Sequence, residues 1–117
     1  MPDRATIPHP LPDELVELIA QRFRVIGEPM RIRILDSLRD RALTINELSE
    51  TLGASQQNIS KHVNLLAQAG IVVREKDGNR VRCSIADDSI FELCELVCGG
   101  LRKQVVELDQ LLSGGAA

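Results

Sequence analysis

The sequence predicts a mainly α-helical domain that carries one small β-hairpin. Two short amphipathic segments, 44–53 and 55–70, each open with a helix-capping residue and close at a glycine. The apolar period then changes from that of a helix to that of a strand over residues 71–86, around Asp77-Gly78. Helical periodicity also precedes and follows this unit. Together these features indicate a winged helix-turn-helix flanked by helices at its N- and C-terminal ends.

Length and composition favour one domain between two flexible ends. The chain has 117 residues, of which 44% are apolar, with no Trp or Tyr and two Phe, so its core must be aliphatic. Residues 1–11 contain three prolines and are interpreted as a flexible arm. Residues 12–112 form the predicted domain, and residues 113–117 a flexible tail.

The sequence lacks the features of a membrane or secreted protein. No apolar run approaches the ~20 residues of a membrane span, and the first residues lack the apolar region of a signal peptide. Three cysteines, an odd number, favour reduced thiols. We therefore expect a cytoplasmic protein without a membrane partner.

Two helices are expected before the central unit. Residues 12–26 have apolar side chains at helical spacing, and Gly27 and Pro29 end that segment. Pro29 suits the first position of the next helix. Four apolar residues of that helix are expected to face inward: Met30, Ile34, Leu35 and Leu38.

The central pair of helices is marked by its caps. Thr44 with Glu47 forms a predicted capping box, and Gly53 ends the first helix. Ser55 caps the second helix, which Gly70 ends. Its expected buried stripe is Ile59, Val63 and Leu66.

The hairpin and the last helix complete the pattern. In the second strand Val81, Cys83 and Ile85 should face the core and alternate with Arg80, Arg82 and Ser84, which should face solvent. Asp88 or Ser89 is expected to cap a long helix that runs to about Leu112.

The formal net charge of −3 conceals a basic region. Residues 55–82 contain five Lys or Arg against two acids, a net charge of +3, and the remainder has a net charge of −6. A basic face on an acidic body is compatible with phosphate binding by one surface.

The second central helix has the residues of a DNA-reading helix. In a helix-turn-helix, its N-terminal residues meet base edges in the major groove. Gln and Asn pair with adenine, Lys and the helix N-terminus bind phosphate, and arginines on the hairpin reach the adjacent backbone or minor groove. The candidate DNA-binding residues are Ser55, Gln56, Gln57, Asn58, Ser60, Lys61, His62, Arg80 and Arg82.

Over residues 20 to 112 the chain resembles the ArsR/SmtB family of bacterial repressors. The segments that carry the resemblance are FRVIGEPMRIRILDSL, the run from LTINELSETLG through NRVRCSIAD, and the final helix. The resemblance implies a homodimer paired through its first and last helices. It also implies a repressor on double-stranded DNA with a palindromic operator, which an inducer releases.

The last helix itself also favours a dimer. Apolar residues recur at intervals of four and three over roughly three heptads, which is typical of a helix–helix seam. Packing within one chain is the alternative. The candidate dimerisation residues are Leu15, Leu18 and Ile19 in the first helix, and Ile90, Cys94, Val97, Leu101, Val105 and Leu108 in the last.

Two sensor sites known in the family are absent from this sequence. The thiol motif at the start of the first central helix is replaced by Thr44, Ile45 and Asn46. The zinc site of the last helix needs histidines, and the two histidines of this chain, His9 and His62, lie elsewhere.

Cys94 and Cys98 remain as a candidate metal site. Four residues apart on a helix, their Cβ atoms lie about 5–6 Å apart, too far for a relaxed disulfide but suited to one soft ion. Thiolates favour As(III), Cd(II), Hg(II) or Cu(I) as the inducing ion. A third ligand would come from the other subunit or from Cys83, although a structural role for Cys83 is favoured.

Three other interpretations stay open. In the first, the two cysteines are small fillers of the helix seam. In the second, thiol oxidation or persulfide chemistry switches the same repressor. In the third, the winged helix is a protein-interaction module without DNA binding or inducer. The sequence contains neither a nucleophile–base pair nor a phosphate-binding loop, so we do not expect an enzyme.

Overall fold

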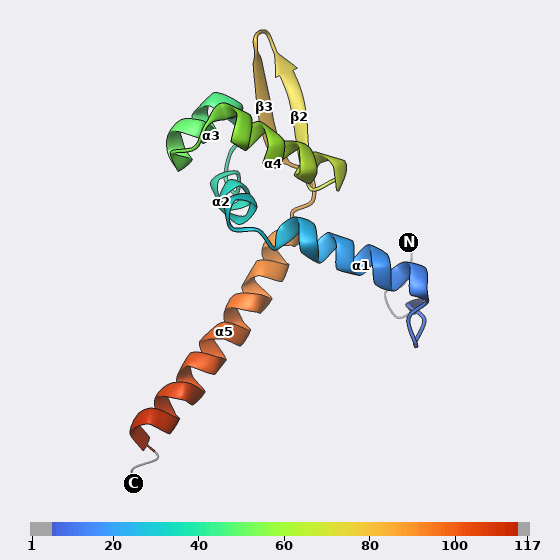
Figure 1. Cartoon of the computed structure of the whole chain (residues 1–117), viewed down its shortest axis with the longest axis vertical. Helices are drawn as coiled ribbons and strands as arrows, with labels where there is room; N and C mark the ends of the chain where they lie inside the picture. Colours follow the sequence, from blue (N-terminus) through green and yellow to red (C-terminus); the bar gives the residue numbers. More distant parts are fainter. Residues whose placement is uncertain (1–5, 115–117) are drawn as a thin grey trace. The chain divides into compact units, whose positions relative to one another are not determined.

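The computed structural model describes residues 6–114 and shows a winged helix-turn-helix and a long C-terminal helix (Figure 1). The predicted fold class is confirmed. One compact unit ends at Ala86, and a second begins at Asp87. The elements are α1 (Asp13–Ile26), α2 (Pro29–Ser37), β1 (Leu43–Thr44), α3 (Ile45–Leu52), α4 (Gln56–Gln68), β2 (Val72–Asp77), β3 (Arg80–Ile85) and α5 (Ser89–Ser113).

The predicted arm and tail lie partly outside the described residues. Residues 6–12 precede α1 without a helix or strand of regular length, and α5 continues to Ser113. Residues 1–5 and 115–117 are not described. The division into arm, domain and tail therefore stays a prediction.

The connection from α1 to α2 is set by local chemistry. Gly27 follows the last residue of α1. A Cβ atom added at this position would lie 2.9 Å from the Phe23 carbonyl oxygen, which is too close for any other side chain without a local shift. The Glu28 carboxylate then accepts a hydrogen bond from the Arg31 backbone N–H at 2.9 Å, and Pro29 occupies the first turn of α2, as predicted.

The predicted inward face of α2 is confirmed in large part. Ile34, Leu35 and Leu38 are buried, and Met30 is half-buried. They join an aliphatic core to which every helix and strand of the first unit contributes. The contribution of β2 is Val72, because the other residues of that strand are exposed. The other fully buried side chains of this core are Leu48, Ile59, Val63, Leu66, Ile71 and Cys83.

Both predicted caps of the helix-turn-helix are present. The Glu47 N–H donates to Thr44 Oγ1 at 3.1 Å and the Thr44 N–H donates to Glu47 Oε1 at 2.9 Å, which completes the capping box of α3. Gly53 ends α3 with φ of 63°, a left-handed conformation that favours glycine. Ser55 Oγ accepts from the Asn58 N–H at 3.1 Å and starts α4.

The sheet contains one strand that the sequence pattern did not predict. β1 pairs antiparallel with β3, so the strand order is β1-β3-β2. A strand of two residues is too short to show a period of two. The β2–β3 hairpin projects beside α4 as the wing (Figure 1).

The hairpin turn lies one residue later than predicted. Asp77 pairs with Arg80, so Gly78 and Asn79 form the two-residue loop. Gly78 has φ of 64°, which glycine adopts without steric cost, at the first loop position.

The second unit consists of α5 and the residues around its start. Asp88 is the N-cap residue without a side-chain bond, and the Asp87 carboxylate instead accepts from the Ser89 N–H at 3.1 Å. None of the helices within residues 6–114 has the length and hydrophobicity that a bilayer span requires.

Candidate nucleic-acid interface

The first turns of α4 present their polar side chains to solvent because the opposite side of the helix is committed to the core. Ile59, Val63 and Leu66 are fully buried. Ser55, Gln56, Gln57 and Lys61 are exposed, and Asn58 and Ser60 are half-buried. The candidate DNA-binding residues of α4 other than His62 thus lie outside the core.

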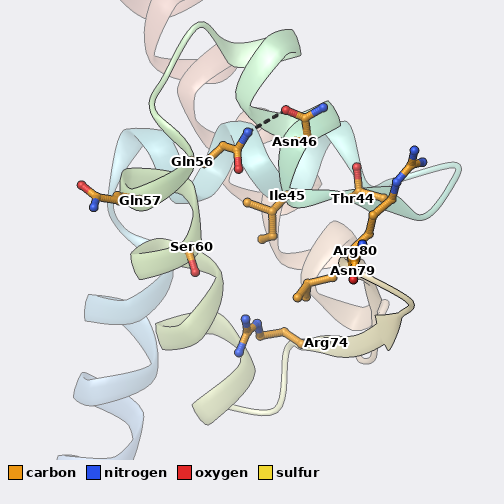
Figure 2. A pocket seen from close by; sticks show the side chains of 10 residues that line it. Thr44, Ile45, Asn46, Gln56, Gln57, Ser60, Arg74, Asn79 and Arg80 are labelled. Atoms are coloured by element: carbon orange, nitrogen blue, oxygen red, sulfur yellow. Dashed lines mark hydrogen bonds between the residues drawn. The ribbon is translucent and has the colours of Figure 1, made fainter.

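A groove of about 330 Å³ lies between the start of α4, the start of α3 and the wing (Figure 2). Gln56, Gln57 and Ser60 line it from α4, and Arg74, Asn79, Arg80 and Val81 line it from the hairpin. Thr44, Ile45 and Asn46 complete the lining. The structure therefore brings Gln56, Gln57 and Ser60 together with Arg80, whereas the predicted residues Ser55, Asn58 and Lys61 do not line the groove.

Four polar residues of this groove were absent from the sequence-based set: Thr44, Asn46, Arg74 and Asn79. The pairing register explains Arg74. It lies opposite Cys83, and directly paired residues share a face of the sheet. Because Cys83 is buried, that face is turned toward the helices, and in Figure 2 the Arg74 side chain extends toward α4.

Arg82 lies on the other face of the hairpin and does not line the groove. It pairs with Glu75 in the sheet, and its Nη2 lies 3.3 Å from Asp77 Oδ2. Of the two predicted wing arginines, Arg80, at the loop end of β3, lines the groove, while Arg82, two residues further along the strand, is held in an exposed ion pair with Asp77.

The groove is suited to an anion. Arg74 and Arg80 are exposed, and no carboxylate belongs to its described lining. The α4 N-terminus, which carries a partial positive charge, opens onto the same side through Gln56 and Gln57. Amides for base edges and cations for phosphates are therefore adjacent.

His62 differs from the other α4 candidates, because it faces inward. The residue is 8% exposed, and its Nδ1 lies 3.0 Å from Arg31 Nη1 and 3.6 Å from Glu28 Oε2. Burial next to the α1–α2 connection gives His62 a packing role. We therefore remove it from the residues proposed to contact DNA.

The surroundings of His62 favour its neutral form. Burial lowers the pKa of His62; the Glu28 carboxylate opposes this effect, while Arg31 and Lys61 add to it. An arginine only donates hydrogen bonds, so Nδ1 accepts from Arg31 and the neutral ring carries its proton on Nε2. Hydrogen bonding to the Arg31 backbone lowers the pKa of Glu28, which stays ionised.

The three cysteines differ in accessibility. Cys83 is fully buried, and burial raises the pKa of its thiol, so the structural role favoured for it agrees with its position. Cys94 is half-buried and Cys98 is exposed, both on α5 and both free thiols. Within residues 6–114, no three His, Cys, Asp or Glu side chains gather as a metal site.

The candidate dimerisation residues are mostly exposed in the single chain. In α1, Leu15 is half-buried, whereas Leu18 and Ile19 are exposed. In α5, each seam position from Val97 to Leu108 is more than half exposed, while Ile90 is buried at 3%. Ile90 is therefore buried and Cys94 is half-buried, unlike the seam positions from Val97 onward.

Comparison with known sequences supports a regulator. A family described as a helix-turn-helix domain matches residues 26–75. The HTH-type transcriptional regulator Rv0081 of Mycobacterium tuberculosis is 34% identical over 110 residues, which cover 90% of this chain and 96% of the relative. The HTH-type transcriptional repressor SmtB of the same organism is 33% identical over 75% of this chain and 65% of its own.

Solved structures show the same arrangement. The crystal structure of Rv0081 aligns with a TM-score of 0.73 and 32% identity over 82% of this chain and 97% of that one. The antimony-specific transcriptional repressor AntR aligns with a TM-score of 0.65 and 26% identity, over 89% of this chain and 91% of that one.

Proposed function

Because the chain belongs to the ArsR/SmtB family of winged helix-turn-helix transcriptional regulators, we propose that it is a homodimeric repressor, acting in the cytoplasm, that an inducer releases from a palindromic operator. Its relatives are DNA-binding regulators and not enzymes. The observation that carries the proposal is the groove in which the amides of α4 meet Arg74 and Arg80 of the wing.

The dimensions of α4 fit DNA. Its 13 residues span about 20 Å at 1.5 Å per residue, and a B-DNA major groove about 12 Å wide admits one such helix. With α4 in the major groove, Gln56 and Gln57 reach base edges. Arg74, Arg80 and Lys61 then hold the flanking phosphates.

Binding to DNA from the protein's own promoter tests this role. We expect the affinity to fall steeply as salt rises, and to be at least ~10³-fold higher for the promoter than for random DNA. Affinity that depends on neither salt nor sequence would leave the protein-interaction module as the better description.

The exposed seam of α5 supports the homodimer. Val97, Leu101, Val105 and Leu108 are each more than half exposed, and a continuous apolar row of this length marks an interaction surface. A second copy offers the matching row, as the heptad spacing requires. Two α4 helices related by a two-fold axis would read a palindrome.

Cys94 and Cys98 are the proposed inducer site, for a thiophilic metal or metalloid ion. They are accessible thiols one helical turn apart, so two sulfur atoms face the same side of α5. Such a donor set suits As(III), Cd(II) or Hg(II), and AntR is named as an antimony-specific repressor. The absence of a third ligand within residues 6–114 favours completion of the site by the partner subunit.

The inducer is tested by titrating the protein–DNA complex with As(III), Cd(II), Hg(II) and a persulfide donor. We expect one of the ions to release wild-type protein, and Cys94→Ser/Cys98→Ser to stay bound. Cys83→Ala, the matched control, should respond like wild type. Release by the persulfide donor alone would favour the thiol switch, and unchanged release of the double variant would exclude these cysteines as the sensor.

A further inference from the structure

A side-chain hydrogen bond joins α3 to the first residue of α4 inside the groove. Gln56 Nε2 donates to Asn46 Oδ1 at 2.7 Å, and both residues are exposed (Figure 2). Ten residues separate them in sequence. The bond is therefore a product of the helix-turn-helix geometry, which brings the starts of the two helices to the same side.

This bond restricts the Gln56 amide. A free glutamine side chain rotates about three bonds and presents its donor and acceptor ends interchangeably, at a large cost in entropy when it is ordered. With one Nε2 hydrogen committed to Asn46 Oδ1, the Gln56 amide cannot turn over by itself without losing that bond. It leaves the other N–H and the Oε1 acceptor for a ligand.

One donor and one acceptor are what the major-groove edge of adenine requires. Adenine offers the N7 acceptor and an N6 donor, which a glutamine amide contacts in bidentate fashion. Orientation before binding matters because an ordered side chain has less freedom to lose when the complex forms.

We infer that Asn46 is a positioning residue for operator recognition: it orients the Gln56 amide so that this residue reads adenine. The inference rests on the proposed function, since it assumes that α4 enters the major groove. Asn46 acts through Gln56, and its own Nδ2 group remains a donor for a phosphate or a bridging water.

The test measures base preference at every position of an operator half-site that wild-type protein has selected from randomised DNA. Gln56→Ala first identifies the position that Gln56 reads. At that position we expect Asn46→Ala to lower the preference for adenine by about 3- to 10-fold. Its affinity for random DNA should stay within about twofold of wild type, since no charge is lost.

Asn46→Asp supplies the conservative rescue. Its carboxylate still accepts from Gln56 Nε2, so the preference for adenine should be kept, while repulsion of phosphate weakens binding to all DNA alike. Thr51→Ala, an exposed α3 position outside the groove lining, is the control and should match wild type.

Two results would overturn the inference. One is a base preference of Asn46→Ala equal to that of wild type at the Gln56 position. The other is an equal loss of preference in Asn46→Asp and Asn46→Ala. Failure of wild-type protein to select any sequence is a different outcome, because it would reject the proposed function itself.

Discussion

Arg31 connects three helices of the first unit through its guanidinium. Its Nε donates to the Val25 carbonyl oxygen at the end of α1 at 2.5 Å, and its Nη1 donates to His62 Nδ1 of α4. Arg31 itself belongs to α2, where its backbone N–H binds Glu28. A lysine cannot replace these two guanidinium donors, because its single ammonium group lacks the planar, forked geometry of arginine.

The buried His62 ring predicts a dependence of stability on pH. Since burial lowers the pKa of His62 in the folded state, the unfolded chain takes up a proton first as the pH falls. The stabilisation is complete above the unfolded pKa of about 6.5 and is lost below it. Urea unfolding at pH 7.5 and 5.5 should show a lower free energy of unfolding at pH 5.5.

The chain offers a matched control for this measurement. His62→Gln should lose part of the difference between the two pH values, whereas His9→Gln should retain it, because His9 is exposed on the N-terminal arm. Equal pH dependence of wild type and His62→Gln would contradict the assignment of the effect to His62.

The two faces of the wing predict different roles for its arginines. Arg74 lines the groove and Arg82 is paired with Asp77 on the other face. Arg74→Ala should weaken binding to specific and random DNA alike and reduce the salt dependence by about one phosphate contact. Arg82→Ala should have the smaller effect in the same salt titrations, and the reverse order would place the DNA on the opposite face of the wing.

At the level of elements, α1 is attached to both α4 and α2. Arg22 Nη1 of α1 donates to the Ala69 carbonyl oxygen at the end of α4 at 2.7 Å. Together with the bonds of Arg31, this fixes α1 against the helix that carries the proposed base contacts.

The glycines of α5 predict a gain in stability on substitution. Gly99 and Gly100 are helical, and an added Cβ meets no atom within 4 Å in the described chain. Gly100 lies about 100° around the helix from Leu101, away from the seam. Gly100→Ala should therefore raise the free energy of unfolding by up to about 1 kcal/mol, measured by urea unfolding.

An opposite result would be informative. Lower stability of Gly100→Ala, combined with weaker self-association, would show that another chain approaches this side of α5. The interface between the two chains would then include Gly99 and Gly100 in addition to Val97, Leu101, Val105 and Leu108.

Elements with explicit boundary chemistry were predictable from the sequence, and elements fixed by tertiary contacts were not. The capping box of Thr44 and Glu47 and the left-handed Gly53 are local signals, and both are present. β1 exists only because Leu43 and Thr44 pair with β3. Two residues alone carry no periodic signal.

The same distinction separates the residues of the candidate site. Gln56 and Gln57 follow from their place after the Ser55 cap, which is a local feature. The side of Arg74 depends on strand register, and the inward direction of His62 depends on its partners Arg31 and Glu28. An arginine count or a helix period does not contain that information.

At the scale of the whole molecule, the dimer is the main prediction. Leu101→Glu places a charge in the seam and should convert the dimer to a monomer and abolish operator binding, measured by sedimentation and DNA titration. Leu96→Glu is the control: Leu96 is 74% exposed and lies about 140° around the helix from Leu101. Dimers of Leu101→Glu as tight as wild type would reject the seam.

The bond between Asn46 and Gln56 has a consequence for how this protein evolves. The core-facing stripe of α4 is separate from its groove-facing amides, so operator preference can drift without loss of folding. A substitution at position 56 alone, however, leaves the Asn46 side chain without the hydrogen bond that it accepts from Gln56. Lineages that recognise new operators should therefore exchange positions 46 and 56 as a pair, and a designer who wishes to retarget the protein should mutate them together.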